Sequence, residues 1–225
     1  SSDLIASLKE SGYKVIVLIN SSYAMELGPL EEYNVDAALW IGGPGVKGAM
    51  AIGRILSGEV NPSGRLVDTY AYDLTTASTF IPSDNYKLLN EKGEQIGGYT
   101  DYSEGIYYGY RWYETADAEG FWSSDYAREK WGIENGYEDV VQYPFGYGLS
   151  YTSFTQSFSV EPVYRDGVFS FTVAINNTGS APGKEVVELY VEAPYIEGGV
   201  EKSKVALAAF EKTGMIPAGG NETIT

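Results

Sequence analysis

Hydrophobic residues in the first seventy positions form short unbroken runs, with amphipathic stretches around them. Two apolar runs cover residues 15–19 and 37–41, and runs this short are typical of strands buried on both faces of a parallel sheet. Residues 1–12 and 45–58 instead carry apolar residues at helical spacing. With a further strand expected over residues 64–70, the pattern predicts an α/β fold with a mainly parallel sheet flanked by helices.

The pattern becomes polar and aromatic over residues 71–142, which are rich in tyrosine and tryptophan. Such rings either form a local core or stack against the C–H faces of a sugar, and both uses stay open for different rings. Within this excursion, Ile106, Tyr108 and Tyr110 alternate with other residues, which predicts a strand or an arm of a hairpin.

After Phe154 the pattern changes to alternating apolar and polar residues. Val168, Phe169, Phe171, Val173 and Ile175 precede a turn, and a second alternating run covers residues 186–191. Residues 204–225 add two or three further strands, which is fewer than an immunoglobulin-like sandwich of about seven strands needs. The sequence therefore predicts an α/β domain over 1–151 and an incomplete all-β sandwich over 152–225.

Composition excludes several classes of chemistry. The chain has no cysteine and no histidine, so thiol nucleophiles, disulfides, histidine-based triads and the commonest metal ligand are absent. A net charge of −16 without a basic cluster argues against a nucleic-acid partner, and no apolar run is long enough to predict a membrane span. No metal site and no cofactor are expected.

Ligands of open parallel sheets bind beyond the carboxyl ends of the strands. Asn20 follows the first predicted strand, and Trp40 lies near the end of the second, so we expect both at this edge as candidate substrate-binding residues. The nearby sequence "GGPGVKG" lacks the spacing and the lysine-serine ending of a phosphate loop, and Pro44 has no amide hydrogen to donate. Phosphate binding is therefore not predicted, although Trp40 could equally point into the core.

Three strings in order carry a family resemblance. The stretches "VDAALWIGGPGVKGAMAIGRILSGEVNPSGRLVDTY", "YSEGIYYGYRWYE" and "YPFGYGLSYTSF" resemble the C-terminal α/β-sandwich domain of family 3 glycoside hydrolases. "NNTGSAPGKEVVELYV" is similar to the fibronectin type III-like domain that follows it there. The resemblance implies that the aromatic residues of 143–154 are largely buried at the junction of the two domains.

The resemblance also implies what this chain lacks. Family 3 enzymes are retaining glycosidases with a nucleophilic Asp in a (β/α)₈ barrel of about 250 residues and an acid/base Glu in an "EGxDR"-like stretch. The retaining mechanism needs both carboxyl groups about 5 Å apart, and neither motif occurs here. Glu104 belongs to a packing segment of the family pattern, so we predict no catalytic residue. "PGVKGA" also departs from the common "PGQEGG", which weakens transfer of contacts to that loop.

Two functions are consistent with these features. The first is a part of a β-glucosidase-like or β-xylosidase-like exo-glycosidase, which hydrolyses terminal β-linked sugars. In that case the chain supplies a cleft wall and a scaffold beside the barrel of the same polypeptide, and it is inactive alone. The alternative is a stand-alone carbohydrate-binding or surface adhesion module. The motifs follow the order of the enzyme, which favours the first function.

Overall fold

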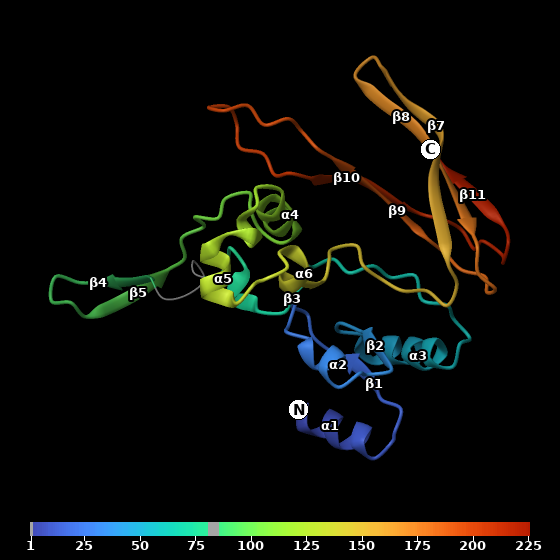
Figure 1. The fold of residues 1–225 in the computed structure, drawn as a ribbon, viewed down its shortest axis with the longest axis horizontal. Coiled ribbons are helices and arrows are strands. Elements are labelled where there is room, and N and C mark those ends of the chain that lie inside the picture. Colours follow the sequence, from blue (N-terminus) through green and yellow to red (C-terminus); the bar gives the residue numbers. More distant parts are fainter. Residues whose placement is uncertain (1, 81–85) are drawn as a thin grey trace. The chain divides into compact units, whose positions relative to one another are not determined.

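The computed structural model describes residues 2–80 and 86–225, so residues 81–85 of the aromatic excursion lie outside the description (Figure 1). By its internal contacts the chain divides into two compact units. The first comprises Ser1–Gly43, Val67–Phe145 and Glu192–Ala206, and the second comprises Pro44–Leu66, Gly146–Val191 and Leu207–Thr225. Both units are assembled from separate stretches, and the boundary expected near residue 151 lies within a stretch of the second.

The first unit begins with the predicted alternation of helices and strands. Its elements here are α1 (Ser2–Glu10), β1 (Ile16–Ile19), α2 (Gly28–Glu32) and β2 (Ala37–Trp40). Strands β1 and β2 are parallel, with Ile16 opposite Ala37 and Ile19 opposite Trp40. Helix α1 ends just before Gly12, whose φ of +79° lies in the left-handed region that glycine adopts without strain.

Burial of this strand pair differs from the expectation. Only Ile19 of the two strands is buried, whereas Ile16 is 50% and Leu18 is 42% exposed. The prediction that both faces are covered is therefore wrong for the described residues. The physical reason is that the sheet contains just two strands, so side chains on both of its faces lack the neighbours that a wider layered sheet provides.

The mainly parallel sheet is not found among the described residues. Residues 64–69 are not a strand, and only β3 (Tyr70–Ala71) forms, which pairs with β6 (Val141–Tyr143) in antiparallel fashion. The pairs β4–β5, β7–β8 and β8–β11 are antiparallel as well. Apolar runs indicate strands but not their partners, which is why β1–β2 is parallel as expected while the strand expected over residues 64–70 does not join them.

The aromatic excursion forms a local core of its own. Its helical elements are η1 (Leu74–Thr76), α4 (Tyr110–Ala118), η2 (Phe121–Ser123), α5 (Asp125–Trp131) and α6 (Tyr137–Val140). Trp122 is 1% exposed at the centre, where it packs edge-on against Trp112 and Phe121 and donates from Nε1 to the Tyr113 carbonyl over 3.2 Å. The core interpretation is therefore confirmed for these rings.

One local prediction within the excursion is wrong. The segment expected to be a strand from the alternation of Ile106, Tyr108 and Tyr110 forms a turn followed by α4. Gly109, at φ +53°, precedes the helix. The residues buried in α4 are Tyr113 and Ala116, whose spacing of three places both on one helical face. The helical spacing of apolar residues from residue 110 onward therefore determines the local structure, and the short alternation over residues 106–110 does not.

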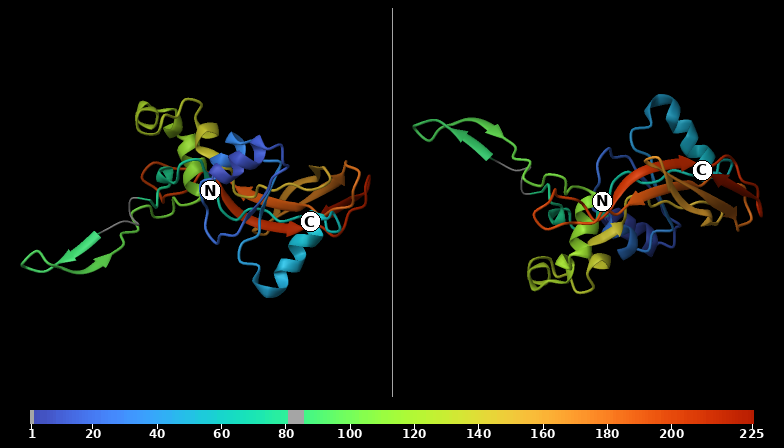
Figure 2. Two further views of the ribbon diagram at one scale, coloured as in Figure 1. Left: turned by 90° about the horizontal axis from the view of Figure 1, so that it is seen from below. Right: turned by 90° about the horizontal axis from the view of Figure 1, so that it is seen from above.

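The excursion also contains a two-stranded hairpin. Strands β4 (Tyr86–Leu89) and β5 (Gln95–Tyr99) pair only with each other, and Tyr86 stacks on Tyr99 with ring centroids 5.0 Å apart. Figure 2 shows this hairpin in green in both views. Leu88, Leu89 and Ile96 remain exposed on it.

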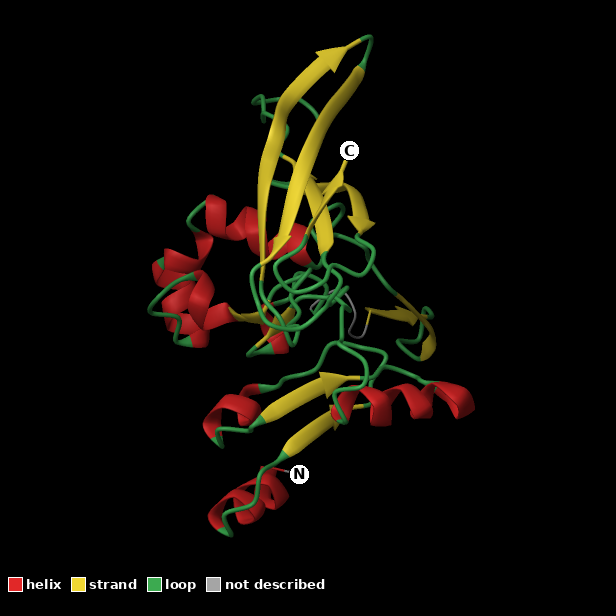
Figure 3. Ribbon diagram, turned by 90° about the vertical axis from the view of Figure 1, so that its right-hand side faces the viewer, coloured by secondary structure: helices red, strands yellow, loops and turns green. Residues whose placement is uncertain are grey.

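The second unit contains the predicted alternating strands. They are β7 (Phe154–Arg165), β8 (Val168–Asn177), β9 (Val186–Val191), β10 (Ala206–Lys212) and β11 (Asn221–Ile224), all but the first residue of β10 lying in this unit. One sheet has the order β11-β8-β7, and β10 pairs with β9 in another. Figure 3 shows the long β7–β8 hairpin in yellow. A small core of Val173, Ile175, Val187 and Ile216 lies here.

Helix α3 (Gly45–Leu56) also belongs to the second unit and forms over the predicted residues. Two residues of its apolar stripe are exposed, Val46 at 96% and Met50 at 74%. No helix in residues 2–80 or 86–225 has the length and hydropathy of a membrane-spanning segment.

The junction segment 143–154 is less buried than expected. Tyr147 and Tyr151 are exposed, and Tyr143, Phe145 and Phe154 are only partly buried. Phe145 packs against Tyr110 in the first unit, with ring centroids 4.7 Å apart, whereas Phe154 packs against the small core of the second. The prediction that these rings are largely buried is wrong for Tyr147 and Tyr151.

Candidate functional site

The carboxyl edge of the β1–β2 pair brings the two predicted site residues to neighbouring strands. Ile19 and Trp40 are opposite each other in the register, so Asn20 and Ile41 follow at the same edge. The Ile41 amide donates to the Ile19 carbonyl over 3.0 Å, which keeps the strands joined to this point. Asn20 is exposed, and no hydrogen bond of its side chain occurs among the described residues.

Trp40 lies over its own loop rather than in a core. Its indole Nε1 donates to the Ser21 carbonyl over 2.9 Å, which ties the loop after β1 to the end of β2. Gly42, at φ +53°, lies against the ring, and a Cβ there would be 3.3 Å from Trp40 Cζ2. With 37% of the residue exposed, one part of the indole is packed and another part is free to stack.

Ser21 has a role that sequence reasoning did not assign. Its hydroxyl donates to the Tyr23 carbonyl over 2.7 Å and accepts from the Tyr23 amide over 3.1 Å. This local turn holds the Ser21 carbonyl in the position that receives the indole N–H. The signal was present in "NSS", because Ser side chains favour such turns.

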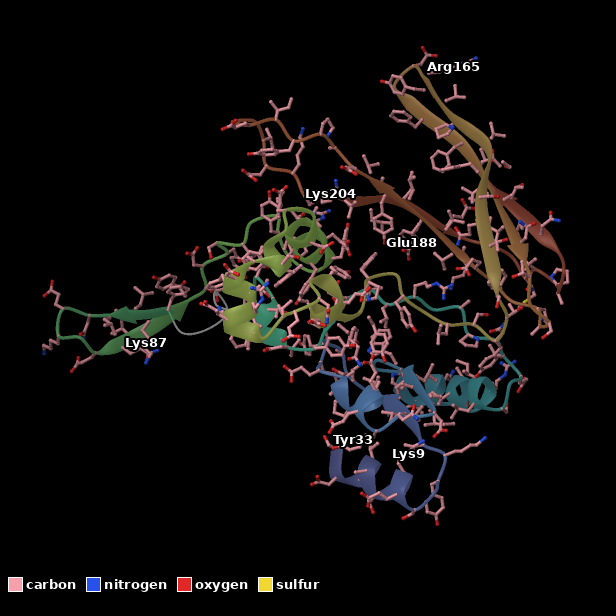
Figure 4. All side chains as sticks on the ribbon, viewed as in Figure 1. Lys9, Tyr33, Lys87, Arg165, Glu188 and Lys204 are labelled. Carbon is pink, nitrogen blue, oxygen red and sulfur yellow. The ribbon has the colours of Figure 1, made fainter. Side chains whose placement is uncertain are left out.

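The amino edge of the same strand pair is occupied by a structural carboxylate. Asp36 Oδ2 accepts from Lys9 Nζ and from the Val15 amide, each over 2.8 Å, and Figure 4 labels Lys9 on α1. The hydrogen bond from Lys9, followed by that from Val15, lowers the pKa of Asp36 below its ordinary value. Asp36 is thereby fixed as an anion that joins α1, β1 and β2.

Other carboxylates of the first unit are also engaged in packing. Glu31 on α2 accepts from the Tyr72 hydroxyl over 2.8 Å and from Gln142 Nε2 over 3.1 Å. Burial, together with the bond to Glu31, raises the pKa of Tyr72 to about 12, so this phenol stays neutral and acts as a donor. Sequence reasoning could not find this network, because its three members are far apart in the chain.

Glu104 lies in the turn before α4, where its carbonyl accepts from the Tyr107 amide over 3.0 Å. Its Oε2 is buried and has no hydrogen-bond partner in the described part of the chain. Within residues 2–80 and 86–225 there is also no cluster of three Asp or Glu residues that could hold a metal ion.

Comparisons with known proteins agree with the family resemblance. Residues 1–110 match the family model described as "Glycosyl hydrolase family 3 C-terminal domain". A "Beta-glucosidase" of Ruminococcus albus is 33% identical over 99% of this chain, which covers 20% of that relative. An "Exo-alpha-(1->6)-L-arabinopyranosidase" of Bifidobacterium longum is 26% identical over 98% of the chain and 25% of its own length.

Solved structures give the same result. Beta-glucosidase 3B from Thermotoga neapolitana, in complex with alpha-D-glucose, matches 99% of this chain with a TM-score of 0.73 and 32% identity, and the chain covers 27% of that structure. The chain thus spans about a fifth to a quarter of the length of the relatives that it matches. These findings confirm the resemblance of the chain to the C-terminal region of family 3 glycoside hydrolases.

Proposed function

We propose that this chain is one part of a retaining, exo-acting glycoside hydrolase that removes terminal β-linked sugars. The observation that supports the proposal best is the match to β-glucosidases along almost the whole chain, in the motif order of those enzymes. The described residues supply a partly exposed indole and an exposed amide side chain at one sheet edge. An aromatic ring next to an amide is a suitable pair for a sugar, which offers C–H faces and hydroxyl groups.

In this proposal the chain is scaffold and cleft wall, and the reacting carboxylates belong to other parts of the polypeptide. The nucleophile comes from a (β/α)₈ barrel, and the acid/base Glu comes from a motif that this sequence lacks. Trp40 and Asn20 bind sugar, and Ser21 positions the indole through its carbonyl. The relatives differ in both the sugar and the linkage that their names state, so the proposal names no particular sugar and takes the β-linkage from the beta-glucosidases.

Two activity measurements test this proposal. Purified chain 1–225 is expected to hydrolyse aryl β-glucosides and β-xylosides no faster than buffer, whereas the polypeptide that includes the barrel hydrolyses at least one of them. A Glu104→Gln variant of the isolated chain serves as control for an unrecognised catalytic residue. Turnover by the isolated chain that falls in this variant would overturn the assignment of catalysis to other segments.

The role of Trp40 is tested in the full polypeptide. Trp40→Ala is expected to lower kcat/KM by about 10-fold to 100-fold, which corresponds to roughly 1–3 kcal/mol of transition-state stabilisation. Trp40→Phe keeps a stacking ring without the N–H donor and is expected to retain most activity. An unchanged kcat/KM in folded Trp40→Ala would refute the cleft role, and loss of the melting transition would assign Trp40 to the core. Sugar binding by the isolated chain, with no barrel in its reading frame, would favour the adhesion module.

A further inference from the structure

The connection between β9 and β10 is packed as part of the first unit, although these strands lie in the second. Residues Glu192–Ala206 are here called the strap. By their contacts they belong to the same compact unit as Ser1–Gly43 and Val67–Phe145. The strap has no regular secondary structure before Ala206. Its position must therefore be fixed by side-chain contacts, because a segment without a helix or sheet ladder makes few backbone bonds of its own.

One ion pair and two hydrogen bonds join residues within the strap. Lys204 Nζ forms an ion pair with Glu192, which joins the two ends of the strap. Between these ends, Lys202 Nζ donates a hydrogen bond to the Pro194 carbonyl over 2.8 Å. The turn at the tip is closed by the Gly199 amide, which donates to the Ile196 carbonyl over 2.8 Å. These contacts give the strap a defined shape, so it can move as one piece.

Two contacts fasten the strap to the segment around α4. The Tyr107 hydroxyl donates to Glu201 Oε2 over 2.5 Å and lies 3.3 Å from the Lys202 carbonyl. The Lys204 amide donates to Thr115 Oγ1 over 2.8 Å, and Figure 4 labels Lys204. The bond to Glu201, ahead of burial, raises the pKa of Tyr107 to about 12. The phenol is therefore protonated at neutral pH and can donate this hydrogen bond.

The backbone of Tyr107 is also held by hydrogen bonds. Its carbonyl accepts from Ser78 Oγ over 2.5 Å, and its amide donates to the Glu104 carbonyl over 3.0 Å. The backbone of Tyr107 is thus anchored to two parts of the first unit, while its hydroxyl reaches the strap. An anchored donor that binds a charged acceptor forms one of the stronger kinds of protein hydrogen bond.

We propose that residues 192–206 form a strap that opens and closes on the first unit, and that the bond between Tyr107 and Glu201 is the latch that holds it closed. The tip of the strap carries the exposed side chains Tyr195, Ile196 and Val200. These residues make no core, so release of the latch frees the strap without unfolding the unit.

Limited trypsin digestion of chain 1–225 tests the latch, since Lys202 and Lys204 both lie in the strap and cleavage after either is expected to be faster when the strap is open. The cleavage rate of a rapidly reclosing segment follows the population of its open form. Tyr107→Phe is expected to increase this rate about 10-fold, which equals 1.4 kcal/mol in the opening equilibrium. The control is Tyr102→Phe, at a tyrosine of the same region that is 77% exposed, and its strap is expected to be cleaved at the wild-type rate.

Glu201→Ala tests the same hydrogen bond by removing its acceptor on the strap. Glu197→Ala, on the same segment, is the matched control. Each rate is divided by the cleavage rate of the same denatured variant, which removes the direct effect of the substitution on trypsin. Faster cleavage in Tyr107→Phe and Glu201→Ala, with unchanged melting temperatures and wild-type rates in both controls, supports the latch. Wild-type rates in folded Glu201→Ala, or equal acceleration in the controls, would overturn it.

Discussion

Single side chains give the two ends of the β1–β2 pair opposite characters. At the amino edge, Asp36 Oδ2 accepts hydrogen bonds from Lys9 and from the Val15 amide, which engages this carboxylate in packing. At the carboxyl edge, Trp40 uses its N–H on Ser21 but keeps part of its ring exposed. The difference agrees with the general rule that open parallel sheets bind ligands beyond the carboxyl ends of their strands.

The Asp36 contact predicts a specific dependence of stability on pH. Since the folded pKa lies below the ordinary value near 3.8, the contact stabilises the fold above about pH 4, and this contribution is lost as the pH falls through the folded pKa. Asp36→Asn is expected to lower Tm by about 1–3 °C at pH 7. The difference from wild type is expected to shrink below pH 4.

Thermal melts at pH 7, 4, 3 and 2 follow this difference. Asp125→Asn is the control, because Asp125 forms an exposed ion pair with Arg128 on one helix turn and its loss should change Tm little at every pH. A difference between wild type and Asp36→Asn that is the same at pH 7 and pH 2 would show that ionisation of Asp36 does not stabilise the fold.

Among the secondary-structure elements, those with an uninterrupted local signal were predictable. Residues 2–10, 45–56, 168–177 and 186–191 form the helices and strands that their periodicity indicates. The strand predicted over residues 64–70 does not form over 64–69. Arg65 and Leu66 instead bond to residues more than eighty positions away, and no local pattern encodes such partners. The position of Asn20 and Trp40 at the carboxyl edge of β1–β2 was predictable from strand order, whereas the Ser21 turn and the bond between Tyr107 and Glu201 depend on side-chain geometry.

The segment before β3 is fastened inside the second unit by a buried ion pair. Arg65 donates to the Gly148 carbonyl over 2.8 Å and pairs with Glu185, whose side chain is 9% exposed. Asn61 adds bonds from Nδ2 to the Pro182 carbonyl and from the Tyr151 amide to its Oδ1. The "NPSGRL" string therefore acts as a structural anchor in this chain.

Removing one partner of this ion pair is expected to lower the free energy of unfolding. Arg65→Met leaves the Glu185 carboxylate buried without its partner and is expected to destabilise the chain by about 2–3 kcal/mol, somewhat below the usual range because both side chains keep some exposure. The double variant Arg65→Met with Glu185→Met is expected to recover most of the loss. Urea unfolding followed by circular dichroism measures both, and a double variant no more stable than Arg65→Met would contradict this account.

At the scale of the whole molecule, many large apolar side chains of the described residues are exposed. The bare surfaces include Ile16 and Leu18 on β1 and Val46 and Met50 on α3. Contiguous apolar surface on a soluble protein usually marks an interface. Since the chain spans only a fifth to a quarter of its relatives, the proposed function assigns the covering of α3 to other parts of the same polypeptide.

Charges placed on α3 distinguish the proposed enzyme from a stand-alone module. The double variant Val46→Lys with Met50→Lys is expected to leave the stability of chain 1–225 within about 0.5 kcal/mol, because both side chains are exposed there. In the full polypeptide the same change is expected to cost more than about 2 kcal/mol, because the introduced ammonium groups would be buried without partners. Ala51→Lys, on another face of α3, is the control and is expected to be tolerated in both. If the double variant is tolerated equally in chain and full polypeptide, then α3 is not a buried contact, and the proposal that this chain is scaffold for a larger glycosidase loses its structural basis.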